Sequence, residues 1–75
     1  MNIYVVHSQG VYLHGAIGVY DSYKLAEEMA IKTCKAERDD YHEFPIFCFV
    51  LNDDSEFRLV ATISRKGGVV SVKTG

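Results

Sequence analysis

The stretch that decides the fold is Phe44–Leu51, with the sequence Phe-Pro-Ile-Phe-Cys-Phe-Val-Leu. Apart from Pro45, all of its residues are apolar, so both alternating sets of side chains are apolar. A strand with one face in water alternates apolar and polar residues, whereas a strand that is apolar throughout is covered on both faces. The chain offers one convincing helix, and one helix covers one face. We therefore expect the second face to need a partner.

Length and composition exclude several classes of protein. The 75 residues make a single domain, residues 1–75, with a thin core. The net charge is −2 and the basic residues are scattered, which makes nucleic acid an unsuitable partner. Cys34 and Cys48 are too few for a disulfide scaffold, and no Cys/His spacing suits zinc, so free thiols and no cofactor are expected. The start lacks signal-peptide features and no segment has the length of a membrane span, which favours a cytoplasmic protein.

The order of the expected elements is ββαβββ. Turn residues and apolar periodicity predict strands and a helix at the following places: strands at Asn2–His7, Val11–Val19, Phe44–Leu51, Glu56–Ser64 and Val69–Lys73, and a helix from Ser22 to about Arg38. The connections suit an antiparallel sheet in which the helix returns the chain and the third strand lies beside the first. We predict an α+β fold, a five-stranded antiparallel sheet in the order 2-1-3-4-5 with one helix on one face.

The helix is expected to be capped by Ser22 or Asp21. At 100° per residue, one apolar stripe faces the sheet, formed by Leu25, Ala26, Met29, Ala30, Thr33 and Ala36. Ile31 lies among charged residues on the opposite face, and we interpret it as a single exposed apolar residue.

Turn lengths predict the registers. A three-residue loop in the first hairpin pairs Val5 with Leu13 and places Ile3 and Val5 on the core side, whereas a two-residue loop would flip the first strand. Turns at Asp53-Asp54 and Gly67-Gly68 predict the remaining pairs, which are Val50–Phe57, Cys48–Leu59, Ile46–Ala61, Ile63–Val72 and Arg65–Val70.

One junction resembles a known group. Gly18-Val19-Tyr20-Asp21-Ser22, followed by Ala26-Glu27-Glu28, is similar to a group of small uncharacterised domains from bacteria and their phages. The likeness covers roughly the first two-thirds of the chain, and strand–cap–helix junctions recur widely. It implies a phage or prophage setting, in the host cytoplasm, and carries no catalytic residues with it.

The uncovered sheet face is the expected interaction surface. It is predicted to carry Tyr4, Tyr12, His14, Phe47, Phe49, Leu51 and Val60. An apolar patch of this size favours a homodimer or a bound partner. A second hypothesis places a small-ligand site for a nucleotide signal at a dimer interface, with Tyr4, Tyr12 and His14 as its polar-aromatic groups. A third is an RNA-binding sheet, which the shortage of basic residues disfavours.

Two segments of the chain are acidic. They contain Asp39, Asp40 and Glu43 in one, and Asp53, Asp54 and Glu56 in the other. With His42 the first could hold a hard cation, but it lacks calcium-loop spacing, so a solvated loop is the simpler interpretation. As an alternative, the two segments form an acidic surface that binds a basic protein groove or mimics nucleic-acid phosphates.

No nucleophile–base pair, metal cluster or phosphate loop emerges from the sequence. We therefore expect a non-enzymatic small interaction protein. The phage setting suggests an inhibitor of a host protein or defence complex that acts through the open sheet face, an edge strand or the acidic loops.

Overall fold

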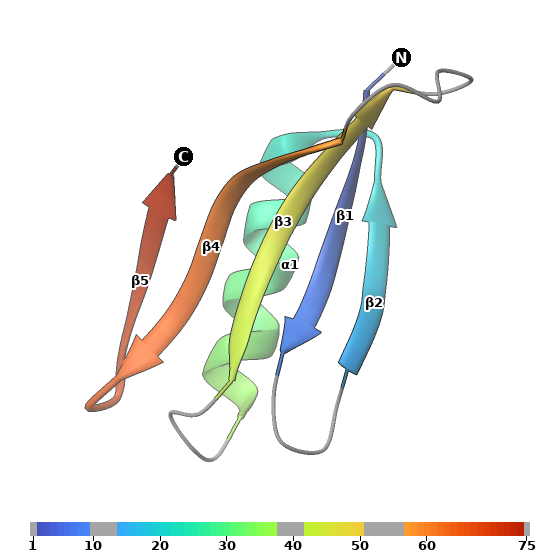
Figure 1. Cartoon of the computed structure of the whole chain (residues 1–75). Helices are drawn as coiled ribbons and strands as arrows, with labels where there is room; N and C mark the ends of the chain where they lie inside the picture. The colour runs from blue at the N-terminus through green and yellow to red at the C-terminus, as the bar shows by residue number, and fades with distance from the viewer. Residues whose placement is uncertain (1, 10–13, 38–41, 51–56, 75) are drawn as a thin grey trace.

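The computed structural model describes residues 2–9, 14–37, 42–50 and 57–74. They form β1 (Asn2–Gln9), β2 (His14–Tyr20), α1 (Tyr23–Ala36), β3 (Glu43–Val50), β4 (Arg58–Lys66) and β5 (Val69–Thr74). The strands make one antiparallel sheet in the order β2-β1-β3-β4-β5 (Figure 1). The predicted α+β fold and strand order are confirmed. No helix formed by the described residues is long and apolar enough to span a membrane.

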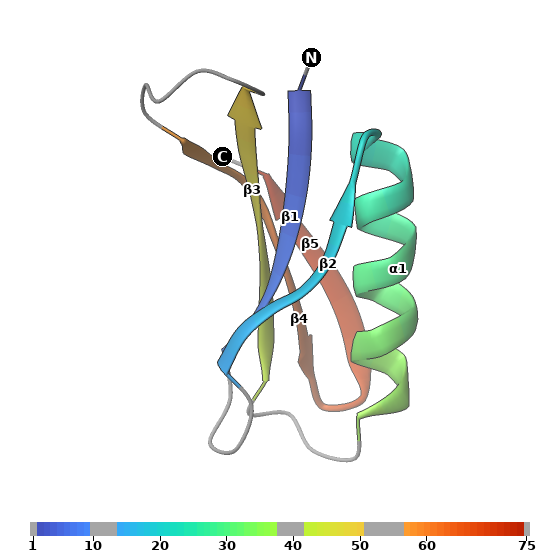
Figure 2. The ribbon, with the colours of Figure 1, turned by 90° about the vertical axis from the view of Figure 1, so that its right-hand side faces the viewer.

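The helix packs on one side of the sheet, as Figure 2 shows from the side. We call the opposite side, which none of the described residues covers, the open face. Ser22 caps α1 as predicted, since its Oγ accepts a hydrogen bond from the Leu25 amide at 3.5 Å. The buried residues of α1 are Ala26, Ala30 and Cys34, spaced four apart. Their small size lets the helix backbone lie close to the sheet.

The predicted apolar stripe of the helix is wrong at its margins. Leu25 and Met29 are 47% and 39% exposed, whereas Ile31 packs against the core instead of lying in solvent. The charged neighbours of Ile31 misled the prediction, because long charged side chains can lie over apolar surface while their heads stay in water. At the end of α1, Arg65 of β4 donates a hydrogen bond from Nη1 to the Cys34 carbonyl oxygen at 3.3 Å.

The first hairpin has a different register from the predicted one. Val5 pairs with Val19, and a bulge leaves Ile17 unpaired between the Val6–Gly18 and His7–Ala16 pairs. Val6 is therefore buried against the helix, and Ile3 and Val5 lie on the open face. The segment Ile3–Val6 is apolar in both alternating sets, so its pattern cannot choose between the two orientations.

A local contact explains why position 18 is a glycine. A Cβ on Gly18 would lie 2.5 Å from the Tyr20 hydroxyl oxygen and 2.7 Å from its Cε2 atom. The ring of Tyr20 thus folds back over the Gly18 backbone, a contact that only glycine allows without displacing the ring.

The β3–β4 pairing is confirmed at one end and wrong at the other. Ile46 pairs with Ala61 as predicted, but a bulge at Val60 shifts the register, so Phe47 pairs with Leu59 and Cys48 with Arg58. The predicted Cys48–Leu59 and Val50–Phe57 pairs do not form. A bulge adds one residue to one strand and reverses which residues of that strand face the core.

The β4–β5 hairpin matches its prediction. Ile63 pairs with Val72 and Arg65 with Val70. Gly67 and Gly68 adopt φ angles of 59° and 80°, as a two-residue type I′ turn requires. The buried core that results combines α1 with the helix-facing residues of three strands, Val6, Phe44, Ile46, Ala61 and Ile63.

Candidate functional site

Three phenylalanines gather on the open face. Phe47 and Phe49 follow β3 at alternate positions, and Phe57 precedes β4. The Phe57 ring stacks on Phe49 with centroids 5.0 Å apart and meets Phe47 edge-on at 5.5 Å. We call these three residues the phenylalanine cluster. The chain has four phenylalanines, so only Phe44 of this residue type lies in the core.

The bulge at Val60 builds this cluster. An uninterrupted register would send Leu59 toward the helix, whereas the shift pairs it with Phe47 on the open face. Leu59 is 40% exposed and Phe57 is 56% exposed. Bulges often redirect side chains beside functional sites. The extra residue therefore moves two large apolar side chains from the core side to the surface.

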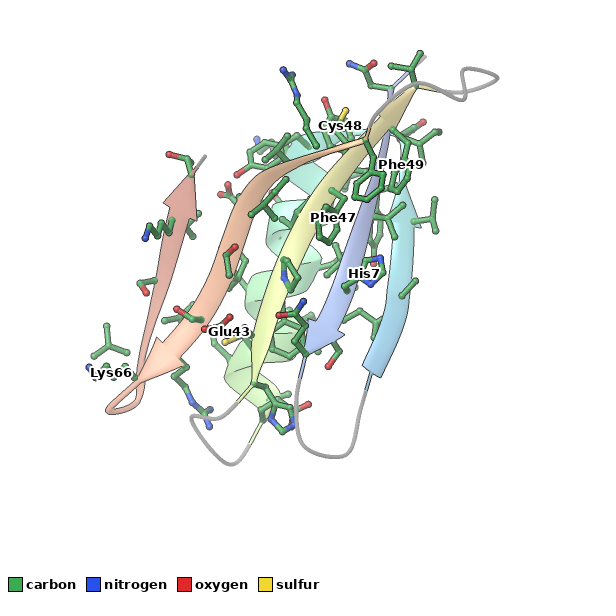
Figure 3. The ribbon with its side chains drawn as sticks, in the orientation of Figure 1. His7, Glu43, Phe47, Cys48, Phe49 and Lys66 are labelled. Atoms are coloured by element: carbon green, nitrogen blue, oxygen red, sulfur yellow. The ribbon has the colours of Figure 1, made fainter. Side chains whose placement is uncertain are left out.

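The neighbouring strand extends the apolar surface. Ile3 and Val5 of β1 lie opposite Phe49 and Phe47. The His7 ring meets the Phe47 ring edge-on, with centroids 5.1 Å apart. Figure 3 shows the labelled side chains of His7, Phe47 and Phe49 together over β1 and β3. The open face thus carries a contiguous aromatic and aliphatic patch bordered by the His7 imidazole.

Apart from the exposed Val69, the open face along β4 and β5 is polar. Thr62, Ser64 and Ser71 share it, and the Ser64 and Ser71 hydroxyl oxygens are 3.3 Å apart. Lys66 and Lys73 also lie on this face, both exposed, toward the β4–β5 side. The face is therefore divided into an apolar end near the end of β3 and a mostly polar side along β4 and β5, where Lys66 and Lys73 are accompanied by the exposed Glu43 of β3.

Several predicted interface residues lie elsewhere. Tyr4 faces the helix, packs against the core and approaches the Tyr23 ring with centroids 5.9 Å apart. Val60, in the bulge, also packs against the core. Tyr12, Leu51 and the His14 side chain lie outside the described residues. The described residues therefore do not assemble a polar-aromatic ligand site from Tyr4 and its predicted neighbours.

Of the six acidic residues in the two predicted acidic segments, only Glu43 lies among the described residues. Glu43 is exposed at the start of β3, while Asp39, Asp40, Asp53, Asp54 and Glu56 lie outside the described residues. His42, expected in a solvated loop, is instead 7% exposed and stacks on Phe44. Its Nδ1 atom lies 3.6 Å from Oε2 of Glu37, at the end of α1. His42, the residue before β3, therefore contacts the end of the helix.

A cavity of about 180 Å³ lies between α1 and the β1–β2 side of the sheet. It is lined by Val6, Ser8, Ile17, Tyr20, Met29, Thr33, Glu37 and Phe44. Pockets for drug-sized ligands are usually roughly 300–1,000 Å³. The cavity is smaller than this, and it opens on the helix side, away from the phenylalanine cluster.

The described residues offer little for catalysis or metal binding. Among them, no group of three His, Cys, Asp or Glu side chains could hold a metal ion. Cys34 and Cys48 are buried thiols. Burial, and then the neighbouring Glu27 carboxylate, raise the pKa of Tyr23 to about 12, so its hydroxyl is held neutral.

Phe57, Leu59, Ile3 and Val5 were missed as members of the surface. One sequence feature could have placed Phe57 on the surface. Four phenylalanines exceed what a thin one-helix core can hold. No sequence pattern marks the bulge itself, because Leu59, Val60 and Ala61 are all apolar. Comparisons with protein-family models, with curated proteins and with solved structures found no match.

Proposed function

We propose that this chain is a non-enzymatic interaction protein that buries its open face against another protein. The observation that carries the proposal is that three of its four phenylalanines lie on the open face. Burying one such side chain stabilises a complex by roughly 1.5–3 kcal/mol. Aromatic residues are enriched at the centres of interfaces, where a few residues carry most of the binding free energy.

The layout of the face defines the chemistry of the partner. The phenylalanine cluster accepts an apolar ridge, and Lys66 and Lys73, farther away on β4 and β5, favour acidic side chains on the same partner. The Ser and Thr hydroxyls between them supply hydrogen bonds. The partner is therefore a protein surface with an apolar centre and an acidic margin.

A sandwich of two open faces from two copies of this chain fits less well. Five strands at about 4.8 Å spacing and eight residues at about 3.3 Å make a face of about 600 Å². The cluster lies toward one end, so a twofold sandwich centred on it overlaps only part of each face. Stable interfaces bury about 600–1,000 Å² per partner, so a partial overlap of two such faces falls short. A larger protein that also covers the polar side and the rim satisfies this requirement.

We further propose that the partner is a host protein that this chain inhibits. This part rests only on the resemblance of Gly18–Ser22 and Ala26–Glu28 to phage domains. A surface that binds without reacting acts by occupying its partner, which is the simplest form of inhibition available to so small a chain.

The experiment is a quantitative capture from native lysate with three immobilised baits: the wild-type chain, Phe57→Ser and Leu25→Ser. Leu25 is a matched control because it is a large apolar side chain, 47% exposed, on the opposite side of the molecule. We expect a protein that wild type and Leu25→Ser retain equally and that Phe57→Ser loses by tenfold or more. Equal capture by all three baits contradicts the proposal.

A further inference from the structure

The two edges of the sheet differ in how well they are protected. β2 forms one edge and contains the Ile17 bulge and Gly15 at a φ of 121°. A bulge on an edge strand disturbs the regular row of backbone groups that another strand would need. β5 forms the other edge and pairs with β4 in one continuous register from Lys66–Val69 to Ala61–Thr74. It contains no proline, and its single charge is Lys73.

The helix covers β5 incompletely. In Figure 1, β5 stands to one side of α1, at the edge of the sheet. Of its residues, Val70 packs against the core, while Val69 and Val72 are 67% and 40% exposed. Val72 pairs with the buried Ile63 and so lies on the helix side of the sheet. Val72 therefore points toward the helix layer, but α1 does not extend far enough to cover it.

The hairpin turn determines which backbone groups of β5 point outward. In a two-residue turn the flanking residues, here Lys66 and Val69, form the first hydrogen-bonded pair. Hydrogen-bonded and non-hydrogen-bonded pairs then alternate along an antiparallel ladder. The N–H and C=O groups of Val70, Val72 and Thr74 therefore point away from β4, toward the free edge.

We propose that two copies of this chain pair through β5 about a twofold axis near Ser71. The two strands run antiparallel, so Val70 of each copy forms hydrogen bonds with Val72 of the other. The two sheets then form one continuous sheet with both helices on the same side.

A second copy fits this edge for three reasons. The Val70–Val72 pairs place apolar side chains opposite one another on the helix side, in the gap between the two helices. Lys73 faces Val69 of the other copy, so no like charges stand opposite each other. The pairing also leaves both open faces exposed on one side, so it is independent of the partner surface proposed above.

A cysteine pair tests the register. Ser71→Cys brings two thiols to the twofold axis as a non-hydrogen-bonded pair with Cα atoms about 4.5 Å apart, within the range of a disulfide. Ser64→Cys is the matched control, because Ser64 is the neighbour of Ser71 on the same face but lies one strand inward. We expect mild oxidation to cross-link Ser71→Cys into a covalent dimer and to leave Ser64→Cys monomeric.

Sedimentation of the wild type and of Val72→Pro provides a second readout. Proline removes an N–H that points to the free edge and leaves the β4–β5 bonds in place, as edge positions tolerate. We expect a wild-type dimer at high micromolar concentration and a monomer with an unchanged circular dichroism spectrum for Val72→Pro. A wild-type monomer at that concentration, or equal cross-linking of the two cysteine variants, overturns the proposal.

Discussion

The two faces of the sheet are built from side chains of different size. On the helix side, α1 contributes Ala26, Ala30 and Cys34 to the core. On the open face, Phe57 stacks on Phe49 and meets Phe47 edge-on, and all three rings remain accessible. On the helix side, small residues allow close packing. On the open face, large apolar side chains stay partly exposed, because none of the described residues covers them.

This difference separates stability from binding. A residue on the helix side should affect folding strongly, because a well-packed core cannot collapse around a lost ring or expand for an added one. A residue of the phenylalanine cluster should affect folding weakly and partner binding strongly. Four substitutions, the last of them compared with wild type across pH, test whether the faces differ in this way.

Phe44→Ala should have the largest effect on stability. Phe44 is among the largest fully buried side chains, and removing a buried aromatic ring costs about 3–5 kcal/mol. Urea unfolding followed by circular dichroism measures the loss, with Phe47→Ala as the open-face comparison. If the two variants lose the same free energy of unfolding, the two faces contribute equally to the core and the comparison fails.

Ala30→Leu should come next. Ala30 is 0% exposed at the centre of the helix–sheet contact, so extra methylene groups force the helix away from the sheet at a cost of about 1–3 kcal/mol. Leu substitution at the exposed Lys24 on the outer side of α1 is the control and should be nearly neutral. A stabilised Ala30→Leu would mean that unfilled space separates the helix from the sheet.

Phe57→Ser should cost less. Phe57 keeps 56% of its surface exposed, so about half of the roughly 1.5–3 kcal/mol of a fully buried aromatic side chain is available to lose. The same unfolding measurement should give a loss of about 1 kcal/mol. A loss as large as that of Phe44→Ala would assign the cluster to the core instead of to an interaction surface.

The smallest effect concerns the Tyr23 hydroxyl on the helix side. Its pKa is raised from 10.0 to about 12 in the folded chain. A raised pKa stabilises the fold fully below pH 10 and progressively less as the pH rises toward 12, because the unfolded chain ionises first. Wild type should therefore lose more stability than Tyr23→Phe between these two pH values. Parallel unfolding curves for both proteins across this range would show that Tyr23 ionises equally in both states.

The sequence predicted those parts of the fold that short-range chemistry determines. Gly67-Gly68 between alternating strands determined the β4–β5 register, and Ser22 marked the start of α1. The single-residue bulges at Val60 and Ile17 were not predictable, because each lies where an apolar or small residue is acceptable on either face. Phe47 and Phe49 were placed correctly on the open face, since they belong to β3, which has no bulge of its own.

The misplacement of Tyr4 has the same origin. Its strand contains an apolar residue at every position from Ile3 to Val6, so only the polar residues at its two ends, Asn2 and His7 to Gln9, could distinguish the faces. Polarity alone would place the side chains of His7 and Ser8 in water. Instead, Ser8 is buried and the His7 ring contacts the phenylalanine cluster. A small hydroxyl fits a tight core, and an imidazole borders an aromatic surface.

The central claim, that the open face is a protein-binding surface, is tested most directly by fluorine NMR on a chain labelled with fluorophenylalanine. The chain gives four signals, one for each phenylalanine, assigned by single Phe→Tyr substitutions. When the captured partner is added, we expect the signals of Phe47, Phe49 and Phe57 to shift or broaden and the signal of Phe44 to stay in place. A bound partner that leaves the three cluster signals unchanged would contradict the account.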